Sequence, residues 1–115
     1  MSDNATALRQ LLLSAPHAAL PMTYQQVATE LGLTPPRTIG QVTQALEQLM
    51  REDAVQQTPF IAALVVSRRG EALPAVGFFE LAVALGRFPE DPTLHEPAYR
   101  AEFQRALIER DPVHR

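Results

Sequence analysis

One stretch limits the possible folds of this chain more than any other: MTYQQVATELGLTPPRTIGQV, residues Met22–Val42. Thr23 can cap the N-terminus of a helix, and Gln26 stands three residues later, where a capping box places Glu or Gln. Gly32 can end this helix, because glycine adopts the left-handed conformation without strain. The Pro35–Pro36 pair prevents the helix from continuing. The stretch therefore predicts a short helix, a tight connection and the start of a second helix, which is the pattern of a helix-turn-helix.

The second helix should begin near Thr38 and end near Glu52 or Asp53. Its apolar residues are three or four positions apart, as on one face of a helix: Ile39, Val42, Leu46, Leu49 and Met50. Polar residues fall on the other side: Gln41, Gln44, Gln48 and Arg51. A first helix over 5–14 has a similar apolar face. We expect the apolar stripe to pack against four residues that precede it: Leu8, Leu12, Val27 and Leu31.

After the helix-turn-helix, the unbroken apolar run from Phe60 to Val66 predicts a strand that is covered on both faces. The segment Leu73–Phe78 can return as a second strand, which Pro74 limits to an edge position. The two strands would form a small β-hairpin, the wing of the domain. Because the chain has only one strong strand, we expect no parallel sheet.

The C-terminal third should be helical. A short helix around Phe78–Leu85 would be closed by Gly86, and Pro97 suits the first turn of a last helix. The apolar stripe of that helix consists of Tyr99, Phe103, Ala106 and Leu107. Its solvated face consists of Arg100, Glu102, Arg105 and Glu109. The predicted fold is α+β and mostly helical: a winged helix-turn-helix, with three helices and a small β-hairpin, over 1–87. Additional C-terminal helices follow, and we expect 88–115 to be a linker and a helix that packs on this domain or on a partner.

The charge and composition exclude several classes of function. The formal net charge is −3, although every basic residue is an arginine. This charge is unfavourable for nucleic-acid binding, since non-specific affinity comes mainly from neutralised phosphates. The chain has no cysteine, which excludes disulfides, thiolate catalysis and thiolate metal sites. The N-terminal residues lack the features of a secretory signal, and no apolar run has the length of a membrane span. We expect a cytoplasmic protein with no membrane contact, metal or cofactor.

Short motifs between Met22 and Phe79 carry a family resemblance: Thr23-Tyr24, Val27-Ala28, Gly32, Pro36-Arg37-Thr38-Ile39-Gly40, Pro59, the apolar run to Val66, Ser67, Gly70 and Gly77-Phe78. In these motifs the chain resembles the C-terminal domain of alkylguanine-DNA alkyltransferases and the alkyltransferase-like proteins. The resemblance implies a winged helix-turn-helix fold. In the family, the arginine at the entry to the recognition helix enters the duplex beside an extruded base, and Arg37 occupies the matching place.

The chain departs from the family at the reactive position. The acceptor cysteine and the His-Arg that follows it are absent, and Phe60-Ile61-Ala62 stand in their place. Alkyl transfer needs a thiolate nucleophile, so this chain cannot perform it. Binding-only relatives replace the cysteine but keep the neighbouring motif, which this chain lacks. The resemblance therefore extends to the DNA-facing helix entry and not to the sequestering of a flipped alkylated base.

The candidate site residues follow from the expected fold: Tyr24, Arg37, Thr38, Gln41, Arg68 and Arg69. Residues at the start of a recognition helix reach base edges, and Arg and Gln suit guanine and adenine edges. Tyr24 can hydrogen-bond a phosphate from the preceding helix, or it can be a half-buried anchor. Arg68 and Arg69 would touch phosphates from the tip of the wing, or they are simply solvated.

Two hypotheses remain open at this point. The first is a non-catalytic, DNA-binding winged-helix protein with a role in regulation. The alternative is a protein–protein interaction module that keeps the fold without binding DNA and uses a helix face or the Phe78/Phe79 region. The acidic balance favours the alternative, and Arg37 favours DNA. A homodimer through the first or last helix is compatible with both. We expect no enzyme, because the sequence shows no nucleophile–base pair or metal cluster.

Overall fold

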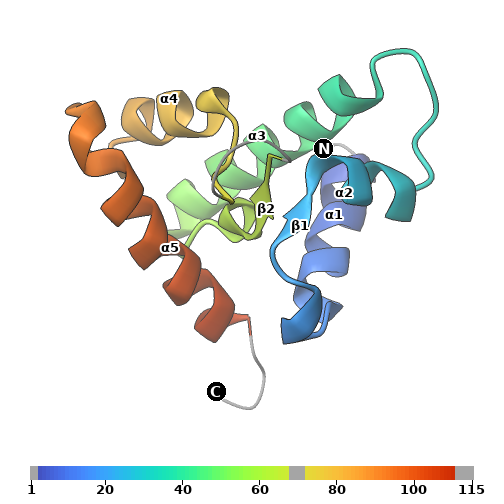
Figure 1. Cartoon of the computed structure of the whole chain (residues 1–115), viewed down its shortest axis with the longest axis horizontal. Helices are drawn as coiled ribbons and strands as arrows, with labels where there is room; N and C mark the ends of the chain where they lie inside the picture. Colours follow the sequence, from blue (N-terminus) through green and yellow to red (C-terminus); the bar gives the residue numbers. More distant parts are fainter. Residues whose placement is uncertain (1–2, 68–71, 111–115) are drawn as a thin grey trace.

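The structure is a computed structural model that describes residues 3–67 and 72–110. Its elements, in chain order, are α1 (Asp3–Ser14), η1 (His17–Ala19), β1 (Met22–Thr23), α2 (Tyr24–Glu30), α3 (Thr38–Gln56), η2 (Ile61–Leu64), β2 (Val65–Val66), α4 (Val76–Ala84), η3 (Pro92–Leu94) and α5 (His95–Glu109), where η marks a short 3₁₀ helix. Figure 1 shows α3 crossing the middle of the molecule, with α1 and α2 on one side of it and α4 and α5 on the other. The predicted α+β, mostly helical class is confirmed.

Helix α2, the connection and the start of α3 at Thr38 lie where the sequence placed them, whereas α3 continues to Gln56, past the predicted end near Glu52 or Asp53. The capping box at the start of α2 is present: the Gln26 amide N–H donates to Thr23 Oγ1 over 3.1 Å, and the Thr23 N–H donates to Gln26 Oε1 over 2.8 Å. Gly32 ends the helix with a φ of +66°, and the Leu33 N–H bonds back to the Ala28 carbonyl over 3.0 Å. Side chains and a left-handed glycine thus satisfy backbone groups that a short helix leaves free.

The core lies where α1, α2 and α3 meet, and most of its predicted members are buried: Leu8, Leu12, Val27, Val42, Leu46 and Leu49. Leu31 is half-buried at the edge of this cluster. Ile39 is 40% exposed, so its assignment to the core is wrong. The helical period is correct, but the core begins one turn later, at Val42, because Ile39 stands in the first turn of α3.

The sheet differs from the expectation. Strand β1 pairs with β2 in parallel, with Met22 opposite Val65 and Thr23 opposite Val66. The exclusion of a parallel sheet was therefore wrong, because β1 has only two residues and its Thr23 also caps α2. Such a short strand has no alternation that could be detected in the sequence.

The expected hairpin is wrong over the residues that the structure describes. The segment Leu73–Phe78 does not form a strand, since α4 begins at Val76. The Ser67 N–H donates to the Leu73 carbonyl over 2.8 Å, which brings the end of β2 next to the segment before α4. Most of the apolar run before it is also not a strand, because residues 61–64 form η2. The run is buried as expected, but continuous burial cannot distinguish a strand from a buried helical turn.

The C-terminal helices complete the core. The expected helix closed by a glycine is α4, and Gly86 has a φ of +77°. Helix α5 begins at His95, so Pro97 lies in its first turn as predicted. It packs on η2, where the Tyr99 hydroxyl donates to the Ala63 carbonyl over 2.8 Å.

Glu102 was expected on the solvated face of the last helix, and this was wrong. The side chain of Glu102 is 1% exposed, and it accepts hydrogen bonds from the Phe60 N–H and from Arg87, both over 2.7 Å. A carboxylate can be buried in this way because charged and backbone donors replace the water that it loses. Over the described residues, no helix is both long enough and apolar enough to cross a membrane.

Candidate nucleic-acid interface

The side of α3 that faces away from the core presents a polar stripe. Its five members are three or four positions apart, which places them on one face of a helix: Arg37, Gln41, Gln44, Gln48 and Arg51. Arg37, Gln44 and Arg51 are exposed, whereas the two other glutamines are half-buried. At 1.5 Å per residue, the stripe is about 21 Å long. Apart from Arg37 and Arg51, its members are neutral amides.

Arg37 stands at the point where the connection becomes α3. Its backbone is left-handed, with φ 54° and ψ 48°, and its side chain makes no capping bond. A residue with a β-carbon adopts this conformation at a cost of about 1–3 kcal/mol. The Arg37 carbonyl accepts the Gln41 N–H over 2.9 Å and so starts the helical ladder. The backbone of Arg37 is therefore fixed by the fold, while its side chain is exposed to solvent.

Arg37 and Arg51 also differ from the other arginines of the described chain. Four others take part in ion pairs: Arg9, Arg87, Arg100 and Arg105. Arg110 donates instead to carbonyls at the end of α1. Within residues 3–67 and 72–110, no ion pair involves Arg37 or Arg51. Among the described residues, the two arginines without a partner thus lie at the start of α3 and on its outer face.

Gln41 has an internal role that the sequence did not reveal. Its side-chain Nε2 donates to the Thr34 carbonyl over 2.9 Å and to the Pro36 carbonyl over 3.1 Å. The amide group therefore holds the α2–α3 connection against the helix. Bidentate recognition of adenine uses both the NH₂ and the carbonyl of the amide. In this conformation Gln41 offers only its carbonyl oxygen, so it positions Arg37 rather than reading a base in bidentate form.

Tyr24 is a half-buried anchor, the second of the two roles considered for it. Its hydroxyl oxygen accepts the Ala75 N–H over 2.9 Å and so joins the start of α2 to the segment before α4. Burial raises the pKa of the Tyr24 hydroxyl, although the bond from Ala75 opposes this shift. The hydroxyl stays protonated at neutral pH and keeps one proton to donate. Thr38 is half-buried in the first turn of α3. Arg68 and Arg69 lie outside the described residues.

A surface hollow of about 290 Å³ lies beside Arg37, and its lining contains no carboxylate: Pro36, Arg37, Gly40, Gln41 and Gln44. Gly40 is the site residue that the sequence reasoning missed. A β-carbon at Gly40 would meet the Arg37 β-carbon at 3.5 Å, an ordinary contact. Its φ is not among the positive values, so the fold does not require glycine here. Glycine inside a helix costs about 0.8–1.0 kcal/mol relative to alanine. Its signal in the sequence was the glycine at the end of the Pro36-Arg37-Thr38-Ile39-Gly40 motif.

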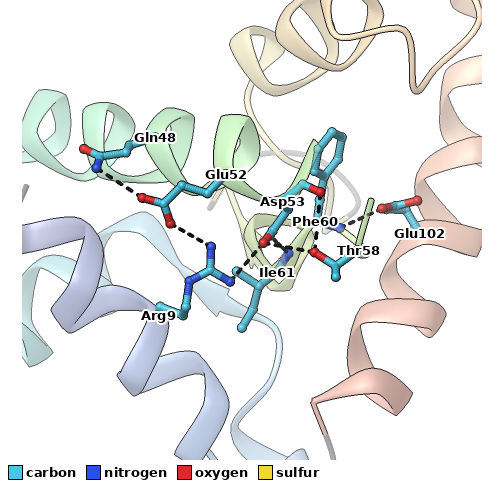
Figure 2. A network of polar contacts seen from close by, with 8 residues as sticks. All are labelled: Arg9, Gln48, Glu52, Asp53, Thr58, Phe60, Ile61 and Glu102. Atoms are coloured by element: carbon cyan, nitrogen blue, oxygen red, sulfur yellow. Dashed lines mark hydrogen bonds and ion pairs between the residues drawn. The ribbon is translucent and has the colours of Figure 1, made fainter. Parts of the chain in front are cut away.

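Two buried carboxylates hold the turn that leads into η2, where the family resemblance places the reactive residues. Asp53 Oδ2 accepts the Ile61 N–H over 3.0 Å, and Glu102 accepts the neighbouring Phe60 N–H. Figure 2 shows these contacts arriving from α3 on one side and α5 on the other. Arg9 pairs with Asp53 Oδ1 at 2.9 Å. These carboxylates are occupied by donors from the protein, so they act as structural supports of the turn.

The electrostatics of this network are set by burial. Burial raises the pKa of the Asp53 carboxyl, against the lowering effect of the Ile61 N–H, of Arg9 and of Thr58. Arg9 also bridges to Glu52 at 3.0 Å, and Glu52 in turn accepts from Gln48 over 3.2 Å. The chain of contacts in Figure 2 therefore links the polar stripe of α3 to the interior.

No reactive group stands where the resemblance would place one. Ala62 lies on the wall of a pocket of about 70 Å³ that is otherwise lined mainly by apolar groups and by Tyr24. Small-molecule sites have volumes of roughly 300–1,000 Å³, so this pocket as it stands is far smaller than such a site. His95, which the sequence places next to Glu96, stacks on Phe79 with ring centroids 5.4 Å apart. Glu96 pairs with Arg100 at 3.2 Å and takes no part in an acid–base pair with His95. Among the described residues, no three His, Asp or Glu side chains are grouped so that they could hold a metal ion.

Comparisons with known proteins add no relative. No protein-family model, no curated protein and no solved structure matches this chain.

Proposed function

We propose that this chain binds double-stranded DNA without catalysing a reaction, and that the start of α3 is its contact surface. One observation carries the proposal: Arg37 is exposed, has no ion pair among the described residues and borders a hollow that contains no carboxylate. In a helix-turn-helix, residues at the N-terminus of the second helix contact base edges. Arginine is the residue that most often makes specific contacts of this kind, with guanine O6 and N7.

The rest of the α3 stripe supports the same surface. Gln44 and Arg51 follow Arg37 along the exposed face, and neutral amides can contact DNA without repelling phosphates. Gly40 would let a sugar-phosphate backbone approach the helix closely, which gives a reason for a glycine that folding does not need. Arg68 and Arg69 lie outside the described residues, so the phosphate contacts expected for them from the sequence stay a prediction.

The net charge of −3 sets the expected strength of binding. With few arginines facing the DNA, few counterions are released, and the affinity should be modest and should depend weakly on salt compared with that of a strongly basic protein. A role as a regulator would then require either a partner or a second copy to increase the affinity through multivalency. The resemblance to alkyltransferases supports the helix entry only, because the chain has no cysteine.

A titration of labelled duplexes with wild type, Arg37→Ala and Arg100→Ala tests the proposal. Arg37→Ala should weaken binding by about 1–3 kcal/mol, the scale of one good base contact. Arg100→Ala removes the same charge from α5, far from the hollow, and should leave binding nearly unchanged. Arg37→Lys separates charge from the planar guanidinium fork and should recover only part of the loss. Thermal melting must show that all variants are folded.

Gly40→Ala provides a second, independent arm. It should raise the free energy of unfolding by as much as about 1 kcal/mol, since the new β-carbon has room. If DNA approaches Gly40 closely, the same variant should bind more weakly although it is more stable.

Equal affinities of wild type and Arg37→Ala would remove Arg37 from the interface. Failure of the wild type to bind varied duplexes at low salt would disprove the proposal and would favour the protein–protein interaction module instead.

A further inference from the structure

Helix α4 is apolar on its outer side as well as on its inner side. Its sequence, VGFFELAVA, contains a single charged residue, Glu80. Phe78 and Ala82 are buried in the core, which accounts for the inner side. On the outer side, Val76 is 72% exposed. A helix that is apolar all round is normally covered on all sides. Over the described residues, this side of α4 is covered only in part, because Phe79 contacts His95 of α5 while Val76 stays exposed.

The outer side of α4 forms one wall of an open groove of about 520 Å³. The apolar part of its lining consists of Val76, Phe79 and Val83 on α4, together with Pro92 and His95. The floor consists of the Phe79 ring stacked on the His95 imidazole, with an angle of 5° between the planes. Phe79 also contacts the buried Phe78 edge-on, with centroids 5.4 Å apart. These ring contacts hold Phe79 and His95 in place within the lining of the groove.

The rim of this groove is acidic. Glu80 and Glu90 both belong to the lining and are exposed, and no ion pair of either one is found among the described residues. No arginine contributes to the lining. An apolar floor between two free carboxylates complements a ligand that has apolar side chains next to positive charges.

We propose that this groove, defined by Val76, Phe79, Glu80, Val83, Glu90, Pro92 and His95, binds a segment of another protein that carries Arg or Lys beside apolar anchor residues. A second copy that docks by two-fold symmetry would place the same acidic rims opposite each other, which is unfavourable. An anionic membrane surface would be repelled by the same carboxylates. The groove is lined by residues of α4, of the segment after it and of the start of α5. Figure 1 shows α4 and α5 on the other side of the molecule from the α2–α3 connection, so the proposal does not depend on DNA binding.

Two synthetic helical peptides of equal length test the proposal on the full chain. Both carry leucines at positions i, i+3, i+4 and i+7; one has arginines at the flanking positions and the other has glutamates. Fluorescence anisotropy gives the affinity, and methyl NMR spectra report on Val76 and Val83. The arginine peptide should shift both valine methyl signals and should bind at least about tenfold more tightly than the glutamate peptide, with an advantage that shrinks as salt is raised.

Matched variants separate the groove from the rest of the surface. Val76→Ser should weaken binding of the arginine peptide about fivefold, the scale of one lost apolar contact. Val55→Ser should not, although Val55 is 79% exposed on α3. The double variant Glu80→Gln/Glu90→Gln should lose the preference for the arginine peptide, whereas Glu30→Gln on α2 should keep it. All four variants change exposed side chains, so their melting temperatures should stay close to that of the wild type.

Three results would overturn the proposal. The first is equal affinity for the two peptides, or no binding of the arginine peptide at any concentration reached. The second is an equal effect of Val76→Ser and Val55→Ser. The third is a shift of the groove methyl signals with protein concentration alone, accompanied by a doubled mass in solution, which would identify a second copy of the chain as the occupant.

Discussion

The buried Glu102 should contribute more to stability than any other carboxylate on α5. It accepts the Phe60 N–H and the Arg87 guanidinium, both over 2.7 Å, and it also pairs with Arg105. Replacement by alanine leaves the buried Phe60 N–H without an acceptor, which costs about 1–3 kcal/mol. It also leaves Arg87 without its partner, and removal of one member of a buried ion pair costs about 3–5 kcal/mol.

These two costs cannot simply be added. The Arg87 side chain is 25% exposed, so it can turn partly toward water after the substitution. It can also keep its contact with the face of the Phe60 ring, whose centroid lies 4.2 Å from the guanidinium carbon. We therefore expect Glu102→Ala to lower the free energy of unfolding by about 3–5 kcal/mol, a large share of the roughly 5–15 kcal/mol of a typical domain.

Chemical denaturation of wild type, Glu102→Ala and Glu96→Ala measures this effect. Glu96 is the matched control, because it lies on the same helix and forms an exposed pair with Arg100 at 3.2 Å. Such surface pairs contribute about 0.3–0.5 kcal/mol. Glu102→Gln keeps an acceptor for Phe60 but not the charge, and it should give an intermediate loss. The slope with denaturant must stay constant for the comparison to hold. A loss below about 1 kcal/mol for Glu102→Ala would refute the assignment of a structural role.

Three further predictions concern the core and the titrating groups. Leu46 is 6% exposed, so Leu46→Ala should lower the free energy of unfolding by about 2–5 kcal/mol, as measured by thermal or chemical unfolding. A loss under about 1 kcal/mol would contradict the place of Leu46 in the core. The raised pKa of Asp53 means that the folded state binds this proton more tightly than the unfolded state. Asp53 should therefore increase the free energy of unfolding as the pH falls from neutral through its folded-state pKa toward 3.8. Unfolding at a series of pH values measures this increase, which should be absent in Asp53→Asn. Burial raises the pKa of both Tyr24 and Tyr99 above 10.0, so the free energy of unfolding should fall as the pH rises past 10.0. The phenolate absorbance should then appear together with unfolding. A gradual titration of either tyrosine in the folded protein would contradict this, because it would show that the hydroxyl is accessible to solvent.

Local chemistry made much of the fold predictable. Thr23, Gln26 and Gly32 define the limits of α2 through short-range hydrogen bonds and backbone conformation, and such signals are contained in a few adjacent residues. The same holds for Gly86 after α4. Helical periodicity predicted the buried face of α3, except at Ile39 in its first turn.

Long-range partners were not predictable in this way. Nothing near Glu102 in the sequence indicates that its carboxylate would meet the backbone of Phe60. The pairing of Met22 with Val65 likewise depends on how α3 folds back, and two residues are too few to show a strand period. At the candidate interface, Arg37 was identified from its place in the motif. The internal bonds of Gln41 and the space around Gly40 required coordinates, because both depend on the path of the connection.

The parallel pair β1–β2 has a consequence for how the chain must fold. Thr23 caps α2 and pairs with Val66. Helix α2, which precedes the candidate DNA surface, therefore begins directly after β1, and the partner strand β2 lies much later in the sequence. Pairing β1 with β2 closes the long segment of chain between them. Such non-local contacts slow folding, because chain entropy is lost before the contacts form. A fragment that stops before η2 would contain the sequence of both helices but not the strand that aligns the first of them. Amide hydrogen exchange should therefore show α2 and β2 opening together as one cooperative unit, so that the α2–α3 pair is acquired only with the whole domain.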